Sequence, residues 1–242
     1  MAVITISKEF GSGGNEIAYR VSEALGYRFF DKRMIIEAAK GANLRERDLF
    51  DLSEDNYRIR SFLGRLLSGT VFETSGEDLE EGEPVNHQQQ MARSRCEEKA
   101  LGLVQRAIKR AYEIGDTVIV GRGGQVVLRG KPNALHVRIE APLEHRIQRV
   151  MNQLRDLSHS MEPDAEFRQR AQAYELIQER DSASAAYLSC YYNCDWSDPG
   201  LYHMIINTAE VSILQAVEMI AGVARRSREF TNLNAAGEYS AG

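Results

Sequence analysis

The sequence has few of the features that mark secreted, disulfide-stabilised or membrane-spanning proteins. Its 242 residues include only 3 cysteines, 5 prolines and 1 tryptophan. Cys96, Cys190 and Cys194 cannot all pair, and their spacing lacks a second ligand pair for zinc, so we expect buried free thiols. No segment approaches the roughly 18 apolar residues that span a bilayer, and the N-terminus lacks a signal-peptide pattern. We therefore expect a cytoplasmic protein that does not bind membranes.

The sequence also lacks an excess of positive charge. Its formal net charge is −5, with 27% charged residues. Binding to a polyanion usually requires lysine and arginine gathered in excess on one face, so nucleic acid is not an expected partner. With 43% hydrophobic residues, the chain is long enough to bury one substantial core. It is therefore expected to fold as a globular protein.

Apolar runs typical of buried strands alternate with helical patterns along the chain. The predicted strands cover residues 3–6, 27–30, 117–121, 134–139 and 203–207. Helices are predicted over residues 16–25, 91–114 and 213–223, and the first of these is expected to end at Gly26. Two further helices are predicted to begin within residues 34–39 and at Pro142. Strands that are apolar throughout and alternate with helices predict an α/β fold, in which both faces of a parallel sheet are covered.

A glycine-rich segment, SKEFGSGGNEIA at residues 7–18, joins the first predicted strand to the first predicted helix. Such a turn exposes backbone N–H groups at a helix N-terminus, where their partial positive charge suits a phosphate group. Gly11, Gly13 and Gly14 would allow close approach to the backbone. A tight strand-to-helix turn needs glycines even where nothing binds, but the position in a βα unit favours phosphate binding. The lysine usual in phosphate loops is missing.

Four blocks of the sequence resemble the cytidylate kinase-like family, a branch of the nucleoside monophosphate kinases. They are ISKEFGSGGNEIAYRVSEALGYRFFDKRMI, VIVGRGGQVVL, HVRIEAPLEHRIQRV and ERDSASAAYLSCYYNCDWSDPGLYHMIINT, in this order. The resemblance implies a P-loop three-layer α/β/α sandwich with a parallel sheet. It also implies one domain over residues 1–228, with a helical nucleotide-binding insertion and acidic loop at about 41–92 and a lid at about 152–195. A flexible tail is expected over residues 229–242.

The resemblance assigns the phosphate-binding role to the glycine-rich loop. Gly11, Ser12, Gly13, Gly14 and Asn15 would cradle the phosphates. In this branch of the family, glycine at position 14 replaces the usual lysine, and a basic residue stands at the position of Lys8. We therefore hypothesise that Lys8 supplies part of the missing charge, with Arg122 as a second source. The alternative for Lys8 is a solvated loop lysine.

Three further residues are candidates for the site. Arg122, at the end of an inner strand, is expected to contact the acceptor phosphate, or to form a structural ion pair. Gly123 stands where cytidylate kinases carry aspartate, and this departure counts against recognition of cytidine. Asp31 would hold Mg²⁺ through water, or cap the following helix. Arg146 would act from the lid side on the transferring phosphoryl group, whereas Arg149 is expected on a solvated helix face.

The lid departs from the family pattern. Members usually carry two arginines after the ERD motif, where this chain has Ser182 and Ser184. Losing such arginines can cost on the order of 10³ to 10⁵ in rate. Trp196 and the neighbouring tyrosines are expected to be packing residues, and His203 a core or edge histidine.

These observations predict ATP-dependent phosphoryl transfer, with Mg²⁺, to a nucleoside monophosphate such as cytidylate, or to another small phosphate acceptor. The activity is expected to be weak. The alternative is a non-catalytic nucleotide-binding regulatory protein that has lost the lid arginines. The sequence identifies neither the acceptor nor the oligomeric state.

Overall fold

The computed structural model describes residues 2–30, 87–157 and 165–237. Its centre is a five-stranded, all-parallel sheet in the order β2-β3-β1-β4-β5. The strands are β1 (Val3–Lys8), β2 (Arg28–Phe29), β3 (Thr117–Val120), β4 (Ala134–Glu140) and β5 (Met204–Asn207). The helices are α1 (Gly14–Leu25), α5 (His87–Ile114), α6 (Gly124–Val127), α7 (Leu143–Leu157), α8 (Ala165–Tyr192) and α9 (Ile213–Gly237), with a 3₁₀ turn η1 (Pro199–Leu201).

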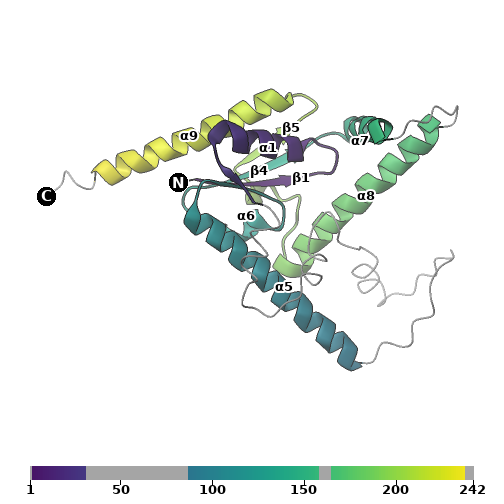
Figure 1. Cartoon of the computed structure of the whole chain (residues 1–242), viewed down its shortest axis with the longest axis horizontal. Helices are drawn as coiled ribbons and strands as arrows, with labels where there is room; N and C mark the ends of the chain where they lie inside the picture. The colour runs from purple at the N-terminus through teal and green to yellow at the C-terminus, as the bar shows by residue number, and fades with distance from the viewer. Residues whose placement is uncertain (1, 31–86, 158–164, 238–242) are drawn as a thin grey trace.

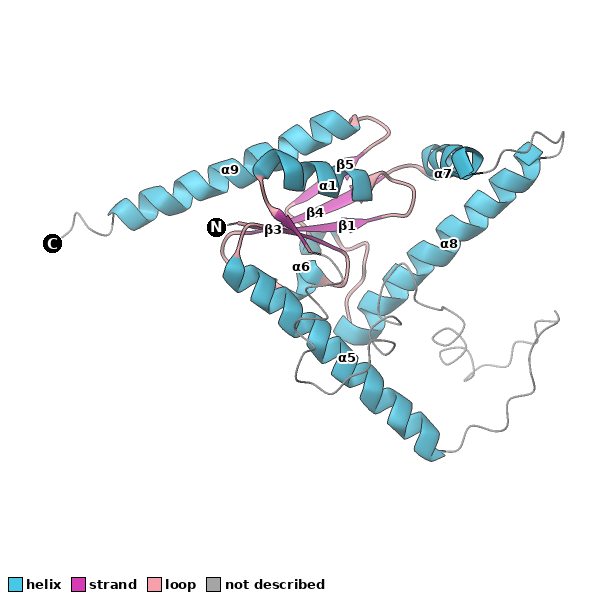
Figure 2. Ribbon diagram, viewed as in Figure 1, coloured by secondary structure: helices cyan, strands magenta, loops and turns pink. Residues whose placement is uncertain are grey.

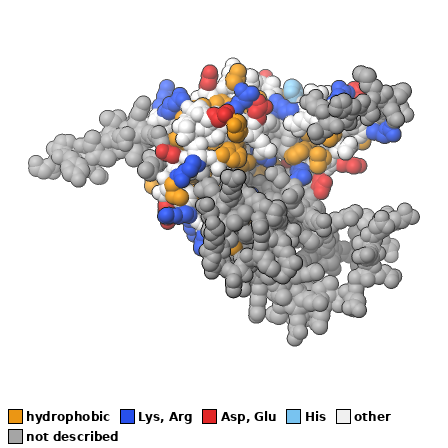
Figure 3. Space-filling view, in the orientation of Figure 1, with side chains coloured by type: hydrophobic (Ala, Val, Ile, Leu, Met, Phe, Trp, Pro, Cys, Tyr) orange, Lys and Arg blue, Asp and Glu red, His pale blue; other side chains and the backbone are white. Residues whose placement is uncertain are grey.

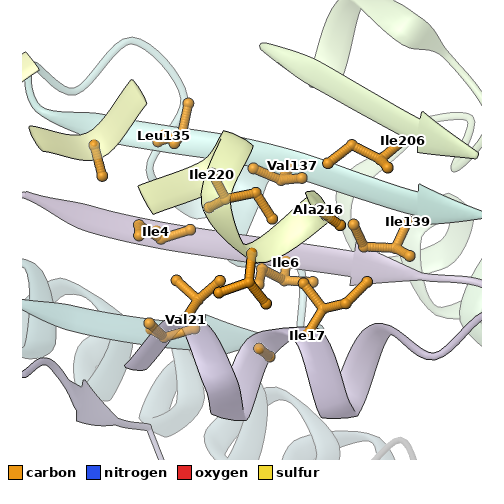
Figure 4. Packing of buried hydrophobic residues seen from close by; sticks show 14 of the residues in the cluster. Ile4, Ile6, Ile17, Val21, Leu135, Val137, Ile139, Ile206, Ala216 and Ile220 are labelled. Carbon is orange, nitrogen blue, oxygen red and sulfur yellow. The ribbon is translucent and has the colours of Figure 1, made fainter. Parts of the chain in front are cut away.

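Helices cover both faces of the sheet (Figure 1). Figure 2 shows α1 and α9 on one side of the sheet and α5 and α6 on the other. Successive strand residues point to opposite faces, so Ile4 and Ile6 of β1 pack with α1 and α9, whereas Val3 packs on the side of α5 and α6. Figure 4 shows the first of these cores, where Ile17 of α1 and Ile220 of α9 meet the strand side chains. Each fully buried isoleucine stabilises the fold by about 1.5–3 kcal/mol. The three-layer α/β/α fold predicted from the sequence is confirmed.

Helix α1 illustrates how the local sequence defines an element. Ile17, Ala18 and Val21 are buried on one face, whereas Glu16 and Arg20 are exposed and form an ion pair of 2.8 Å. The spacing of these apolar residues matches a helix with one buried face. The helix ends at Gly26, whose backbone is left-handed with φ 65°, as the sequence predicted.

Three features differ from the sequence-based expectations. The predicted strand at 27–30 is only two residues long as β2, because it pairs with β3 alone at the sheet edge. The short helix α6 was not predicted, since a glycine-rich turn carries no helical periodicity. Helix α9 continues to Gly237, so the tail expected from residue 229 is helical over most of its length. The reason is that residues 223–236 contain neither glycine nor proline to end the helix.

Some predictions fall outside the described residues. These are the helix expected from 34–39, the acidic loop within 41–92, and Asp31. Among the described cysteines, Cys190 and Cys194 are free, as expected. Their expected burial is wrong, because Cys190 lies on the solvent-facing side of α8 and Cys194 is half-buried. Within the described residues, no helix has the length and apolar character needed to cross a membrane.

Candidate phosphate-binding site

The loop from Glu9 to Gly13 leaves the carboxyl end of β1 and enters α1. Its backbone carbonyls are held by residues from elsewhere in the fold. The carbonyl of Phe10 accepts a hydrogen bond from Arg146, and that of Gly11 accepts one from Arg149, both at 3.3 Å. The carbonyl of Ser12 accepts a 2.6 Å bond from the Thr208 hydroxyl. The loop therefore has its oxygen atoms anchored to α7 and to the residue after β5.

The amide groups of the same loop remain available. Within residues 2–30, 87–157 and 165–237, no acceptor is in hydrogen-bonding range of the amides of Gly11, Gly13, Gly14 and Asn15. Gly13, at φ 84° and ψ 5°, is the N-terminal cap of α1 and contributes no side-chain cap. Unpaired amides at the positive end of a helix form an anion site. The predicted phosphate-binding residues thus lie together in a geometry that suits phosphate.

Lys8 and Gly14 share one small volume. A Cβ atom placed on Gly14 would lie 2.6 Å from the Cβ of Lys8 and 3.1 Å from its Cδ. Contacts this short are not tolerated, so a lysine cannot occupy position 14 while Lys8 is present. The half-buried Lys8 stem thus crosses the beginning of α1. This contact gives a physical reason for the missing lysine.

Arg146 lies at the centre of a buried charge network. Its guanidinium bonds the Ala141 carbonyl at 2.9 Å, the Phe10 carbonyl and the Asp181 carboxylate, and lies 3.4 Å from Glu9. Burial is the main influence on the Glu9 carboxyl and raises its pKa, although the Ala141 amide and the Arg146 charge act in the opposite direction. The predicted catalytic residue Arg146 is therefore placed beside the glycine-rich loop, with its Nε and Nη1 donors used by protein acceptors.

Arg149 was expected on a solvated face, and that expectation is wrong. Its guanidinium donates to the Gly11 carbonyl and to the Thr208 hydroxyl. It also lies over the loop, because a Cβ on Gly13 would be 2.8 Å from its Nη1. The spacing of Arg149 three residues after Arg146 puts both on one side of α7. That spacing is the signal that could have identified Arg149, whereas the contact itself depends on how α7 is placed.

The second glycine-rich turn follows β3 and lies next to the phosphate loop. Gly121 donates to the Ile6 carbonyl of β1 at 2.9 Å. Gly121, Arg122 and Gly123 all have left-handed backbones, with φ of 63°, 58° and 68°. For Arg122 this conformation costs about 1–2 kcal/mol, a strain that is common at functional sites. A Cβ on Gly123 would lie 2.6 Å from the ring of Tyr192, so the end of α8 covers this turn.

Arg138 and its neighbours support the site from the other face of the sheet. Its guanidinium lies 4.5 Å from the ring centroid of Trp196 and bonds the Trp196 carbonyl at 2.9 Å. The Trp196 indole N–H donates to Ser7 at 2.8 Å, and the Tyr202 hydroxyl bonds the Trp196 carbonyl at the same distance. These aromatic residues are buried packing residues, as the sequence predicted. They hold residues 194–202 against β1 and β4.

The metal prediction is not tested by the described residues. Asp31 lies outside them, and within them no group of three histidine, cysteine, aspartate or glutamate side chains could hold a metal ion. A Mg²⁺ ion that arrives with a nucleotide takes most of its ligands from phosphate and water, so it needs few protein carboxylates. The surface in Figure 3 shows basic and acidic side chains interspersed over the described part of the viewed face.

The chain belongs to the cytidylate kinase-like family, whose model matches residues 3–210. No curated protein matches the sequence. Among solved structures, an uncharacterised protein from Eubacterium ventriosum is similar with a TM-score of 0.57 and 19% identity, covering 93% of this chain and 98% of that one. This similarity shows a shared fold.

Two kinases give lower scores. A shikimate kinase from Bacteroides thetaiotaomicron has a TM-score of 0.44 and 11% identity, with 93% of this chain and 98% of that chain covered. A sugar kinase from Janibacter has a TM-score of 0.42 and 14% identity, with 91% and 92% covered. Neither similarity carries an argument about function. Family membership supports a kinase-like phosphotransferase without identifying its acceptor.

Proposed function

We propose that this protein transfers the terminal phosphoryl group of ATP to a nucleoside monophosphate or to another small phosphate-bearing acceptor. The proposal rests on a difference between the carbonyl groups and the amide groups of the phosphate loop. Its carbonyls are bonded outward to Arg146, Arg149 and Thr208, whereas the amides at the beginning of α1 have no protein acceptor among the described residues. This arrangement suits the phosphates of a nucleotide.

Lys8 and Arg149 supply the charge that a phosphate-loop lysine would otherwise provide. The stem of Lys8 crosses Gly14, and the guanidinium of Arg149 lies over Gly13. Both are therefore close to the unpaired amides. The contacts of Arg146 favour a role in holding the loop, because its donors bond Ala141, Phe10 and Asp181.

Arg122 is assigned to the acceptor side. It follows β3, the strand adjacent to β1, and ligands of open α/β sheets gather beyond the carboxyl ends of such strands. In the reaction, an acceptor phosphate oxygen attacks the γ-phosphorus of ATP while the bond to the β-phosphate oxygen breaks and ADP leaves. The protein contributes positioning and charge, and no covalent intermediate is required. Mg²⁺, when bound with ATP, neutralises charge on the phosphates.

The test combines two measurements on the full chain. Calorimetric titration with MgATP measures donor binding, and a coupled assay of ADP formation surveys a panel of nucleoside monophosphates. Binding together with acceptor-dependent ADP release supports the proposal. A protein that does not bind MgATP contradicts it.

A second candidate is a nucleotide-binding regulatory protein without catalytic activity. It is favoured by α8, where Ser182 is exposed and Ser184 half-buried at the positions that carry arginine in the family. Replacing both serines by arginine separates the two functions. In a weak kinase, the double variant should raise turnover more than ATP affinity, since added charge acts mainly on the transition state. In a non-catalytic protein, no product should form with any acceptor.

A further inference from the structure

Helix α8 contacts the phosphate loop at Phe10. One oxygen of the Asp181 carboxylate accepts a 2.8 Å hydrogen bond from the Phe10 amide, and the other is bonded by Arg146. Arg146 in turn donates to the Phe10 carbonyl. Both backbone polar groups of Phe10 are thus held by a single ion pair. The guanidinium of Arg180 also lies over the Phe10 ring, 5.9 Å from its centroid.

The position of Asp181 is determined by packing on both sides along α8. Ala173 and Ile177 are completely buried against α7, and Leu188 is 2% exposed in the aromatic cluster near Trp196. A helix anchored before and after Asp181 presents that carboxylate in one place. Residues 181 and 192 are also separated by about 16 Å along a helix axis, so α8 extends from the phosphate loop to the turn that Tyr192 covers.

We propose that Asp181 is a positioning residue that holds the phosphate loop in its anion-binding conformation, so that the placement of α8 controls the donor site. The Phe10 amide directly precedes the unpaired amides of the loop. If its hydrogen bond to Asp181 is lost, the Glu9–Phe10 peptide keeps its carbonyl bonded to Ser12 but loses its anchor to α8. The loop can then shift, and the amides no longer converge. Arg146 alone fixes only the carbonyl side of Phe10. The role in the donor site rests on the proposed function, but the hydrogen bond between Asp181 and the Phe10 amide can be measured without nucleotide.

The first measurement uses the nucleotide-free protein labelled with ¹⁵N-phenylalanine, in which exchange of the Phe10 amide is followed by NMR. Asp181→Ala should accelerate this exchange by about 10- to 100-fold, the range expected for losing a hydrogen bond to a charged acceptor. Asp181→Asn keeps an oxygen that accepts from the amide and should retain most of the protection. Glu179→Ala is the matched control, because Glu179 is an exposed carboxylate on the same helix. It should leave Phe10 unchanged.

The second measurement is MgATP affinity by calorimetry on the same variants, with thermal unfolding to confirm the fold. Asp181→Ala should weaken binding by about 10-fold, with Asp181→Asn in between and Glu179→Ala like the parent.

Unchanged Phe10 exchange in Asp181→Ala overturns the inference, as does faster exchange with unchanged affinity. If the parent binds no MgATP, the proposed function fails, and with it the donor-site role. The exchange data still decide whether Asp181 holds the loop. If Asp181→Ala does not fold, Asp181→Asn decides the question. Slow exchange of the Phe10 amide in Asp181→Asn supports the role of the acceptor oxygen, and fast exchange in that variant contradicts it.

Discussion

The two glycine-rich turns of this protein follow adjacent parallel strands, yet they are built differently. The turn after β1 leads into the 12-residue helix α1 and leaves its amides unpaired among the described residues. The turn after β3 leads into the four-residue α6, and some amides at its beginning bond carbonyls of the turn itself. Gly124 donates to Gly121, and Val127 donates to Gly123. Glycine content alone therefore does not make a phosphate site, because the hydrogen bonds of the turn decide which backbone groups remain available.

This difference assigns separate tasks to the two turns. After β1 the backbone itself can bind an anion, supported by a helix long enough to have a substantial dipole. After β3 the following helix has only four residues and so a small dipole, and the proposal is that a ligand there is contacted by the Arg122 side chain. The left-handed backbone of Arg122 indicates that the turn is shaped for more than a chain reversal.

The largest expected effect comes from adding a side chain at Gly13. Gly13→Val should lower the affinity for MgATP at least 100-fold, so that binding is no longer measurable. The reason is that its Cβ would lie 2.8 Å from both Arg149 and Ile213. Gly130→Ala is the control for backbone strain, since Gly130 also has positive φ but a Cβ there meets nothing within 4 Å. Calorimetry on both variants, with circular dichroism for the fold, checks this. Equal affinities in Gly13→Val and the parent would falsify the anion-site assignment.

A charge exchange between positions 8 and 14 tests the explanation for the missing lysine. Gly14→Lys alone should destabilise the protein by about 1–3 kcal/mol, as expected for overpacking, because its Cβ meets the Cβ of Lys8. Adding Lys8→Gly removes the obstructing atoms and should recover stability, with a lysine now at the usual place. Thermal unfolding and MgATP titration of the parent, the two single variants and the double variant form the experiment. Additive stability changes in this set would contradict the shared volume.

Arg149 and Arg122 should affect the binding of different substrates. Arg149→Ala should weaken MgATP binding by about 10-fold, the loss expected for one charge-assisted contact, with little change in the acceptor KM. Arg122→Ala should raise the acceptor KM by a similar factor and leave MgATP affinity nearly unchanged. Arg129→Ala, an exposed arginine after α6, is the control. Separate measurement of donor affinity and acceptor KM is the readout, and identical profiles for the two variants would remove the distinction between the turns.

The smallest effect on the site is expected from a substitution of His136, which lies in β4 before Arg138. Burial is the main cause of its pKa being lowered to about 4, and the neighbouring His203, stacked at 4.7 Å, adds to the shift. The folded protein therefore favours the neutral ring, and stability present above pH 6.5 should be lost as the pH falls toward 4. By linkage the loss is roughly 3 kcal/mol.

His136→Gln should flatten this pH dependence without changing MgATP affinity at pH 7. Unfolding midpoints measured between pH 7 and pH 4 provide the check. A variant with the same acid sensitivity as the parent would show that other groups titrate in this range.

Strand and helix patterns predicted most of the fold, because apolar runs and helical spacing depend on local residues. The strands at β1, β3, β4 and β5 and the helix end at Gly26 agree with expectation. What could not be predicted were α6 and the far end of α9, where no periodic apolar pattern guides the assignment. The phosphate-binding role of the glycine-rich loop was predicted from its glycines and its place after a buried strand, and it stays a prediction.

The sequence by itself determined that a glycine-rich loop would join a buried strand to a helix, and that the lysine of that loop was absent. Only the tertiary structure decided what surrounds the loop. Arg149 and Asp181 reach it from α7 and α8, and Thr208 from the residue after β5. These contacts join residues far apart in the chain, so no local pattern contains them. Their geometry depends on how helices and sheet pack, and that packing bonds the loop carbonyls while the amides of Gly11, Gly13 and Gly14 have no acceptor among the described residues.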